Sequence, residues 1–188
     1  MQASDFLSFS PMELKQAILA SEGRTIMAEC VSTDQQQYLG GVTNAEIERA
    51  AGADLILFNA LDVFDPYIAG VPDEIDENPV VWIKKAIGRA VGCNLEPVDQ
   101  DANLDFICLT GNPGTGVSNH AIEDAIKLAK RHFNGLIIAG KMHGAGVDEP
   151  VMNLQIAKRF VELGIDMLLV PAPYTVPYFQ ETYLREIV

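Results

Sequence analysis

Residues 43–60 read TNAEIERAAGADLILFNA and contain the two kinds of element that decide the fold of this chain. The segment opens with Thr43 and Glu46 at the spacing of a capping box, in which each side chain satisfies a free backbone N–H at the start of a helix. It closes with LILFNA (55–60), a short apolar run of the kind that forms a buried strand. The segment therefore predicts a helix followed at once by a strand that is covered on both faces.

The same order of helical segment and apolar run recurs along the chain. Residues 78–79 and 148–150 offer further helix starts, because a capping side chain there precedes a proline. Residues 118–132 carry Ile and Ala at the three and four spacing of a buried helical face. The expected strands are residues 25–31, 55–60, 91–95, 106–110, 136–139 and 167–170. Such alternation indicates βαβ units on a parallel sheet.

The choice among parallel-sheet folds depends on the number of units and on one absent motif. Six βα units are visible, and no Gly-x-Gly-x-x-Gly turn follows the first expected strand. We therefore predict an α/β fold of the (β/α)₈ TIM-barrel type, incomplete with six units, as one domain over residues 1–188. An open flavodoxin-like sheet is the second interpretation. In both folds, functional groups gather at the carboxyl ends of the strands.

Two places suggest that the barrel is interrupted. The connection over residues 96–105 is shorter than the dozen or so residues that a crossover between parallel strands needs. Either the strand at 106–110 is not a parallel neighbour of the strand before it, or a segment is missing after Gln100, which we favour. Residues 181–188 begin like a helix and then stop, so we also expect a truncated C-terminus.

The composition excludes several classes of protein. The 13 basic and 26 acidic residues give a net charge of −13, whereas a nucleic-acid-binding protein needs a basic face. No apolar run reaches the length of a membrane span, and the first residues do not form a secretory signal. Cys30, Cys93 and Cys108 lie in apolar runs, are odd in number and are too far apart for a metal-binding pair. We therefore expect buried free thiols and a cytoplasmic protein.

Polar and ionisable residues recur at or just past the expected strand ends. They are Glu29, Asn59, Asp62, Asn94, Glu96, Thr110, Asn112, Lys141 and His143. The carboxylates of Glu29, Asp62 and Glu96 could hold a hard cation such as Mg²⁺, with Asn59 and Asn94 as neutral oxygen ligands. Alternatively, these carboxylates form ion pairs with Lys141 inside the barrel. The acidic stretch at residues 73–77 is interpreted as a solvated loop.

A glycine-rich turn at residues 110–118 (TGNPGTGVS) leads directly into an expected helix. Backbone N–H groups exposed by glycines, together with a helix N-terminus, form a site for a phosphate or carboxylate. The expected ligand-binding residues of this turn are Thr110, Gly111, Asn112, Gly114, Thr115, Gly116 and Ser118. The turn lacks the Gly-Lys-Ser/Thr ending of a Walker loop, and a purely structural turn is the alternative.

Residues 140–146 (GKMHGAG) follow the fifth expected strand and supply two candidate catalytic groups. Lys141 could form a Schiff base if burial lowers its pKa, or it could hold a substrate carboxylate as a fixed cation. His143 could move a proton or bind a metal. The alternative for both is an ordinary loop position. His120 and His132 lie on an expected helix and are interpreted as surface residues.

Long blocks of the sequence resemble a bacterial family known as a domain of unknown function with a TIM-barrel-like fold. The blocks are EGRTIMAEC (22–30), GVTNAEIERAAGADLILFN (41–59), NLEPVD (94–99), FICLTGNPGTGVSN (106–119), LIIAGKMHGAGVDEP (136–150) and LVPAPYTVP (169–177). Members of this family are labelled phosphoenolpyruvate phosphonomutase-like or haloacid dehalogenase-like. Similar proteins carry an extra stretch between the NLEPVD and FICLTG blocks and continue beyond LREIV, so this chain departs from them at both places.

Three functions are compatible with these residues. The first is an aldolase, lyase or isomerase acting on a small phosphorylated or carboxylated metabolite. In it the glycine-rich turn holds the anion, Lys141 polarises or captures a carbonyl, and Glu29 or Glu96 moves a proton. The second is a ligand-sensing barrel without turnover, and the third is a Mg²⁺-dependent hydrolase. We also expect a homo-oligomer, with Trp82 and residues 174–179 in the core or the interface.

Overall fold

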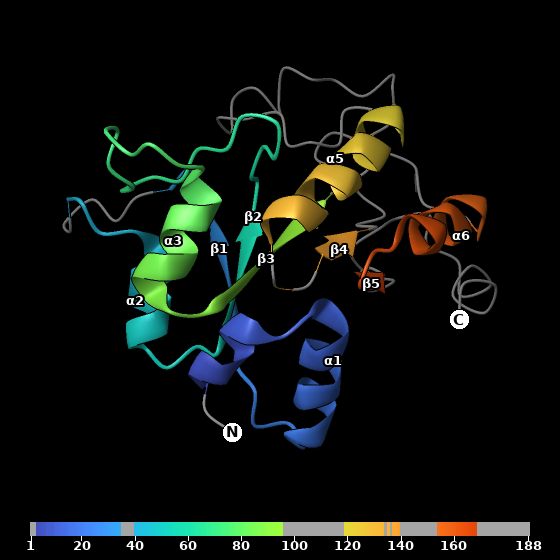
Figure 1. The fold of residues 1–188 in the computed structure, drawn as a ribbon, viewed down its shortest axis with the longest axis horizontal. Helices are drawn as coiled ribbons and strands as arrows, with labels where there is room; N and C mark the ends of the chain where they lie inside the picture. The colour runs from blue at the N-terminus through green and yellow to red at the C-terminus, as the bar shows by residue number, and fades with distance from the viewer. Residues whose placement is uncertain are drawn as a thin grey trace, which may run out of the picture.

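The computed structural model describes residues 3–34, 40–95, 119–133, 135, 137–139 and 154–168, in which strands alternate with helices (Figure 1). The strands are β1 (Met27–Val31), β2 (Leu55–Asn59), β3 (Ala90–Leu95), β4 (Ile137–Ala139) and β5 (Met167–Leu168). The helices are α1 (Pro11–Ala20), α2 (Asn44–Ala50), α3 (Pro79–Ile87), α5 (Asn119–His132) and α6 (Leu154–Leu163), and a 3₁₀ segment η1 (Ala3–Ser8) precedes α1.

The described strands form one parallel sheet in the order β1-β2-β3-β4-β5. Five of the six expected strands are thus confirmed, and the sixth, at residues 106–110, lies outside the described residues. So do the expected helix start at 148–150 and the expected helix at 181–188. Both edges of β3 are occupied, since β3 pairs with β2 and with β4.

One face of the sheet carries the four connecting helices that the structure describes. Buried side chains from α2, α3, α5 and α6 share a single apolar cluster with residues of β1, β2 and β3, among them Phe58 and Val91. In a doubly wound sheet the helices divide between both faces, and a flavodoxin-like sheet has the strand order 2-1-3-4-5. The flavodoxin-like interpretation is therefore wrong, because this sheet is wound in one direction with its helices on one side.

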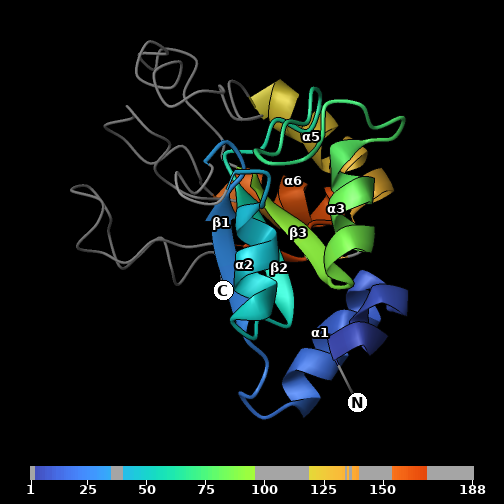
Figure 2. The same cartoon turned by 90° about the vertical axis from the view of Figure 1, so that its left-hand side faces the viewer.

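On the opposite face of the sheet, the described residues form a second apolar cluster at the amino ends of the strands. Leu55, Leu57 and Ala90 form this cluster with Phe6 of η1 and Leu14 of α1. Leu55 and Ala90 are the first residues of β2 and β3, so α1 covers the amino ends of these strands. Both views show α1 below the sheet (Figures 1 and 2). The carboxyl ends of the strands are at the other edge.

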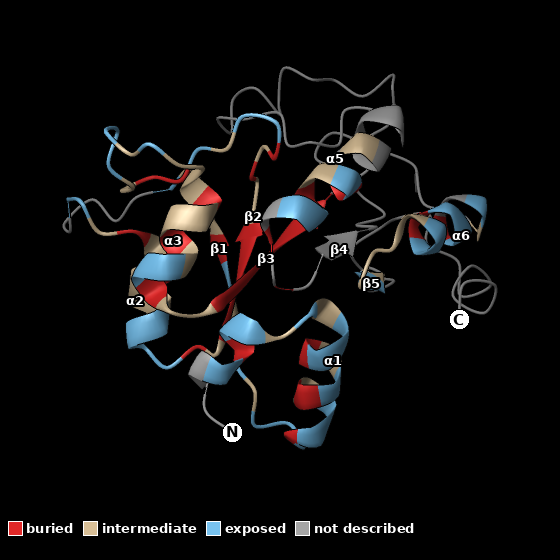
Figure 3. Cartoon of the chain, viewed as in Figure 1, coloured by how far each residue is buried: buried red, intermediate tan, exposed pale blue. Residues whose placement is uncertain are grey.

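Burial follows this layering. Figure 3 shows β2 and β3 as almost continuously buried, while the helices have exposed outer surfaces. Every side chain of β3 is buried, as expected for a strand covered on both faces. None of the helices in the described ranges has the length and apolar character that crossing a bilayer requires.

Helix starts are specified locally, as the sequence predicts. Thr43 caps α2 in a full capping box, and Asn78 caps α3 with Pro79 in its first turn. Asn78 Oδ1 accepts a hydrogen bond from the Val80 N–H at 2.9 Å. These caps fix where each helix begins above the sheet.

Thr43→Ala should lower the free energy of unfolding by about 1–2 kcal/mol. Thr43 is fully buried, its N–H and hydroxyl both donate to Glu46 Oε2 at 2.9 Å, and its Oγ1 accepts from the Glu46 N–H at 3.1 Å. Alanine leaves the Glu46 N–H without this acceptor, whereas Thr43→Ser keeps it. Urea denaturation of both variants checks the prediction, and equal losses for Ala and Ser would contradict it.

Candidate functional site

Two predicted ligand-binding side chains stand side by side at the carboxyl end of the sheet. Phe58 pairs with Cys93, so the next residues, Asn59 and Asn94, are level on neighbouring strands about 4.8 Å apart. Side chains alternate along a strand, and Phe58 and Cys93 belong to the cluster under the helices. Asn59 and Asn94 therefore lie on the face opposite the helices, at the edge where parallel-sheet proteins bind ligands.

Asn94 is buried without hydrogen-bond partners. Its relative exposure is 5%, and neither Nδ2 nor Oδ1 has a partner in the structure as described. Leaving such a group buried and unpaired costs about 1–3 kcal/mol, so native proteins rarely do so without a functional reason. A buried carboxamide with both ends open is suited to binding a polar group of a ligand.

The backbone beside Asn59 is held in an uncommon conformation. Ala60 has φ +54°, in the left-handed region that residues with a Cβ seldom adopt. Its N–H donates to Asn59 Oδ1 at 2.9 Å, while the buried Ser32 donates from its N–H to the Asn59 carbonyl and from its hydroxyl to the Ala60 carbonyl. These bonds tie the ends of β1 and β2 together and fix the Asn59 side chain.

Glu29 lies apart from the asparagine pair. It pairs in register with Leu57, two positions before Asn59, on β1, which is separated from β3 by β2. Glu29 lines a hollow of about 360 Å³ between β1 and α2, together with Asp34 and Glu48. The structure therefore groups Glu29 with these carboxylates rather than with Asn94.

This hollow contains a thiol–carboxylate pair. The Cys30 thiol lies beside the Glu48 carboxylate, and Glu48 Oε2 has no partner within the described ranges. Burial raises the pKa of Cys30, and the nearby Glu48 charge raises it further. Burial likewise raises the pKa of Cys93. Both thiols stay protonated, which confirms their interpretation as small buried groups; Cys108 lies outside the described residues.

Glu48→Gln should stabilise the protein at pH 7 but not below about pH 4. Burial, and secondarily the Glu29 charge, raise the pKa of Glu48 above its ordinary value of 4.5. The folded state then binds the Glu48 proton more tightly than the unfolded state does, so this group lowers stability as the pH rises from 4.5 through the folded pKa. Glutamine does not ionise, so the Glu48→Gln protein does not lose this stability as the pH rises.

The gain at pH 7 should be at most about 0.5 kcal/mol, because water screens a partly covered carboxylate. Urea denaturation at pH 7 and pH 4 measures it, with Glu74→Gln at an exposed position as the control. A gain of equal size at both pH values would show that Glu48 does not titrate as argued.

The predicted metal set is not assembled in the described part of the chain. Asp62 Oδ1 accepts hydrogen bonds from the N–H groups of Phe64 and Asp65, so it stabilises its own turn. No group of three His, Cys, Asp or Glu side chains with metal-binding geometry occurs among the described residues. Glu96 lies outside them, and the Mg²⁺ site stays a prediction.

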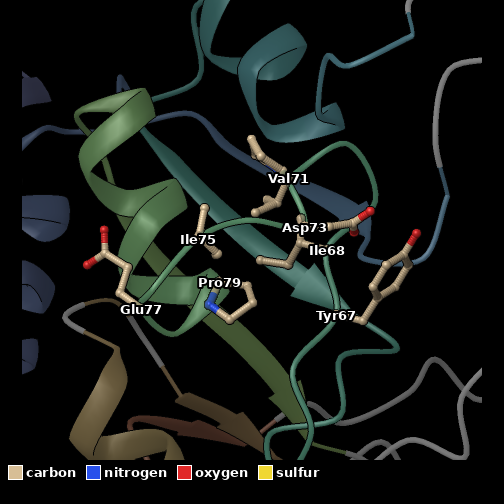
Figure 4. A pocket seen from close by; sticks show the side chains of 8 residues that line it. Tyr67, Ile68, Val71, Asp73, Ile75, Glu77 and Pro79 are labelled. Atoms are coloured by element: carbon tan, nitrogen blue, oxygen red, sulfur yellow. The ribbon is translucent and has the colours of Figure 1, made fainter.

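A second hollow, of about 270 Å³, lies in the connection from β2 to α3 (Figure 4). Figure 4 shows apolar side chains turned toward one another here, with Tyr67 and Asp73 on one side and Glu77 on the other. Asp73, Glu74 and Asp76 are exposed, which confirms the expected solvated stretch. Glu77, which also lines this hollow, pairs with Lys85 of α3. We assign no function to this hollow.

Most other predicted site residues lie outside the described residues. They are Glu96, Thr110, Gly111, Asn112, Gly114, Thr115, Gly116, Ser118, Lys141 and His143. The structure thus brings together Asn59 and Asn94, and the roles of the remaining residues stay predictions. His120 and His132 fall on α5, as expected.

Glu48 was missed as a candidate from the sequence, although a signal was present. It follows the fully buried Ala45 by three positions in α2, and residues three apart share a helical face. Glu48 therefore had to lie toward the sheet, where a carboxylate is unusual.

Comparison with known proteins identifies the family of the chain. The family described as a domain of unknown function, DUF7916, matches the chain over residues 1–104 and 100–188. No curated protein matches the sequence. A crystal structure of 3-hexulose-6-phosphate synthase is similar with a TM-score of 0.40 and 14% identity, over 93% of this chain and 77% of that one. The expected likeness to a family of unknown function is confirmed, and the two enzyme labels stay predictions.

Proposed function

The chain belongs to the DUF7916 family, and we propose that it binds and transforms a small phosphorylated or carboxylated metabolite at the carboxyl end of its sheet. The observation that carries this proposal is the Asn94 carboxamide, which is 5% exposed and has neither of its polar atoms paired within the described ranges. A ligand that pairs with Asn94 would offset the cost of burying it. The class of reaction we propose is that of an aldolase, lyase or isomerase.

We propose further that the sheet closes as a (β/α)₈ barrel around this site. The sequential strand order and the helices gathered on one face support closure, because both are features of a barrel. The position of α1 supports it too, since α1 covers the amino ends of β2 and β3 and leaves the carboxyl ends for a ligand.

The remaining catalytic assignments belong to the same proposal. Residues 110–118 would hold the anionic group, Lys141 would polarise a carbonyl, and Glu96 or His143 would move a proton. Glu29, which lines the hollow with Asp34 and Glu48, is left out of this set. Lys141 follows the last residue of β4 by two positions, and β4 pairs with β3, which supports a place near Asn94. Mg²⁺ binding, self-association and a cytoplasmic location stay predictions.

Asn94→Leu is the variant that tests the proposal. Leucine has a similar size without polar atoms, so it should raise the free energy of unfolding of the ligand-free protein by about 1–3 kcal/mol. It should also abolish binding. The probes are sugar phosphates, short 2-keto acids and MgCl₂ in a thermal-shift assay, where a ligand at 100 times its Kd stabilises the wild type by about 2.7 kcal/mol.

Cys93→Ala is the matched control. Cys93 is the adjacent residue of β3 but lies under the helices, so this variant should lose some stability and keep the ligand-induced shift. A rise in stability combined with lost binding supports a ligand site at Asn94. If Asn94→Leu is less stable than the wild type, Asn94 has a structural role and the proposal is wrong.

A further inference from the structure

We propose that the ligand presents a hydroxyl group to Asn94, so that this part of the site recognises a polyol-like portion of the metabolite and not its anionic group. The inference rests on the proposed function and specifies its substrate class. It follows from three properties of the site: the donor and acceptor capacity of Asn94, the charges on the strands, and the burial of the carboxamide.

A carboxamide requires a partner that both donates and accepts. Asn94 Nδ2 carries two N–H donors and Oδ1 accepts, and both atoms are unpaired where the structure is described. A phosphate or an ionised carboxylate only accepts, so it would pair with Nδ2 and leave Oδ1 facing a negative charge. An ammonium group only donates and would leave Nδ2 unpaired. A hydroxyl group donates and accepts, and therefore satisfies both ends.

The charges on the described strands also disfavour an anion at this place. These strands contain no Lys or Arg, and their one ionisable carboxylate is Glu29. An anion seated against β1–β3 would therefore find no countercharge on the sheet itself. A neutral polar group loses less hydration energy on entering such a site.

Burial makes the recognition selective. With Asn94 only 5% exposed, water has little access to the carboxamide once a ligand covers it. A ligand without the hydroxyl would leave buried donors and acceptors unpaired, and sites of this kind discriminate strongly against such analogues.

Matched ligand pairs test the inference by isothermal titration calorimetry. The pairs are glycerol 3-phosphate with propyl phosphate, and ribose 5-phosphate with 2-deoxyribose 5-phosphate; inorganic phosphate is the anion alone. In the wild type, the hydroxylated member of at least one pair should bind about 10-fold or more tightly than its partner. In Asn94→Leu both members of a pair should lose detectable binding, or, where binding is still measured, their affinities should be equal, whereas Cys93→Ala should retain the ratio.

The outcomes separate this inference from the proposed function. Equal affinities within both pairs in the wild type, with binding still lost in Asn94→Leu, would overturn the hydroxyl assignment and leave the anionic-metabolite site intact. A ratio that persists in Asn94→Leu would also overturn it, because another residue would then read the hydroxyl. If no probe binds, the inference fails, and if Asn94→Leu is also less stable than the wild type, the proposed function fails with it.

Discussion

Gly135→Ala is expected to prevent stable folding. Gly135 is buried just before β4, and a Cβ built on it would overlap the Val91 carbonyl and approach the Gly92 nitrogen to 2.7 Å. All these atoms belong to the backbone of β3, which cannot move aside because it is paired on both edges. A flexible side chain could yield to the added methyl group, but a paired backbone cannot.

The free energy of unfolding should fall by about 4 kcal/mol or more. Losses of this size are typical of severe clashes and of buried unpaired groups. Urea denaturation followed by circular dichroism measures the loss. Gly40→Ala is the control, because a Cβ at Gly40 meets nothing within 4 Å and its φ is not in the left-handed region. A Gly135→Ala protein within about 1 kcal/mol of the wild type would contradict the close approach of this turn to β3.

Lys130→Met should destabilise the protein more than Asp166→Asn does. Lys130 belongs to α5, and Asp166 directly precedes β5. Lys130 Nζ lies 3.6 Å from Asp166 Oδ2. The Asp166 side chain is 7% exposed and that of Lys130 is 33% exposed. Removing one partner therefore has a different consequence from removing the other. Removing the lysine leaves a buried carboxylate without this cation, whereas removing the carboxylate leaves an ammonium group that can turn toward water.

We expect about 3 kcal/mol for Lys130→Met and about 1 kcal/mol for Asp166→Asn. The double variant should recover part of the loss, because it removes the buried charge together with its partner. Urea denaturation of the three variants gives the coupling energy. Equal losses for the two single variants would refute the asymmetry argued from their burial.

Much of the fold could be predicted because its signals are local. LILFN of β2 is buried at four of its five positions, and an apolar run of that length between helices allows few other interpretations. Thr43 and Asn78 specify where α2 and α3 begin by bonding groups two or three residues away. The strand order depends on contacts between segments that are distant in the sequence. The absence of a dinucleotide-binding motif favoured the barrel interpretation, and the described strands follow one another in the sheet as they do in a barrel.

The helix α1 was not predicted, although Ser10 and Glu13 form a complete capping box. Apolar residues occur around much of this helix: Leu14 and Ala17 are buried, while Met12 and Leu19 are exposed. A pattern of this kind does not indicate one buried face. Its packing against Leu55 and Ala90 depends on tertiary contacts that the periodicity of the segment does not reveal.

The candidate site was predicted by position more than by chemistry. Asn59 and Asn94 were identified because they end strands, and parallel pairing brings such residues to one edge. That Asn94 lacks partners could not be predicted, because it depends on which groups surround it in three dimensions. For the same reason, Glu29 could not be separated beforehand from the asparagines and placed with Glu48.

The sequential strand order also has a consequence for how the chain reaches its native state. Each described strand pairs with the described strand that precedes it along the chain, so every pairing step joins segments a few tens of residues apart. Loop-closure entropy rises only slowly with loop length, so these steps carry similar costs. The sheet can therefore assemble unit by unit in the order of synthesis, without waiting for a distant strand to emerge from the ribosome.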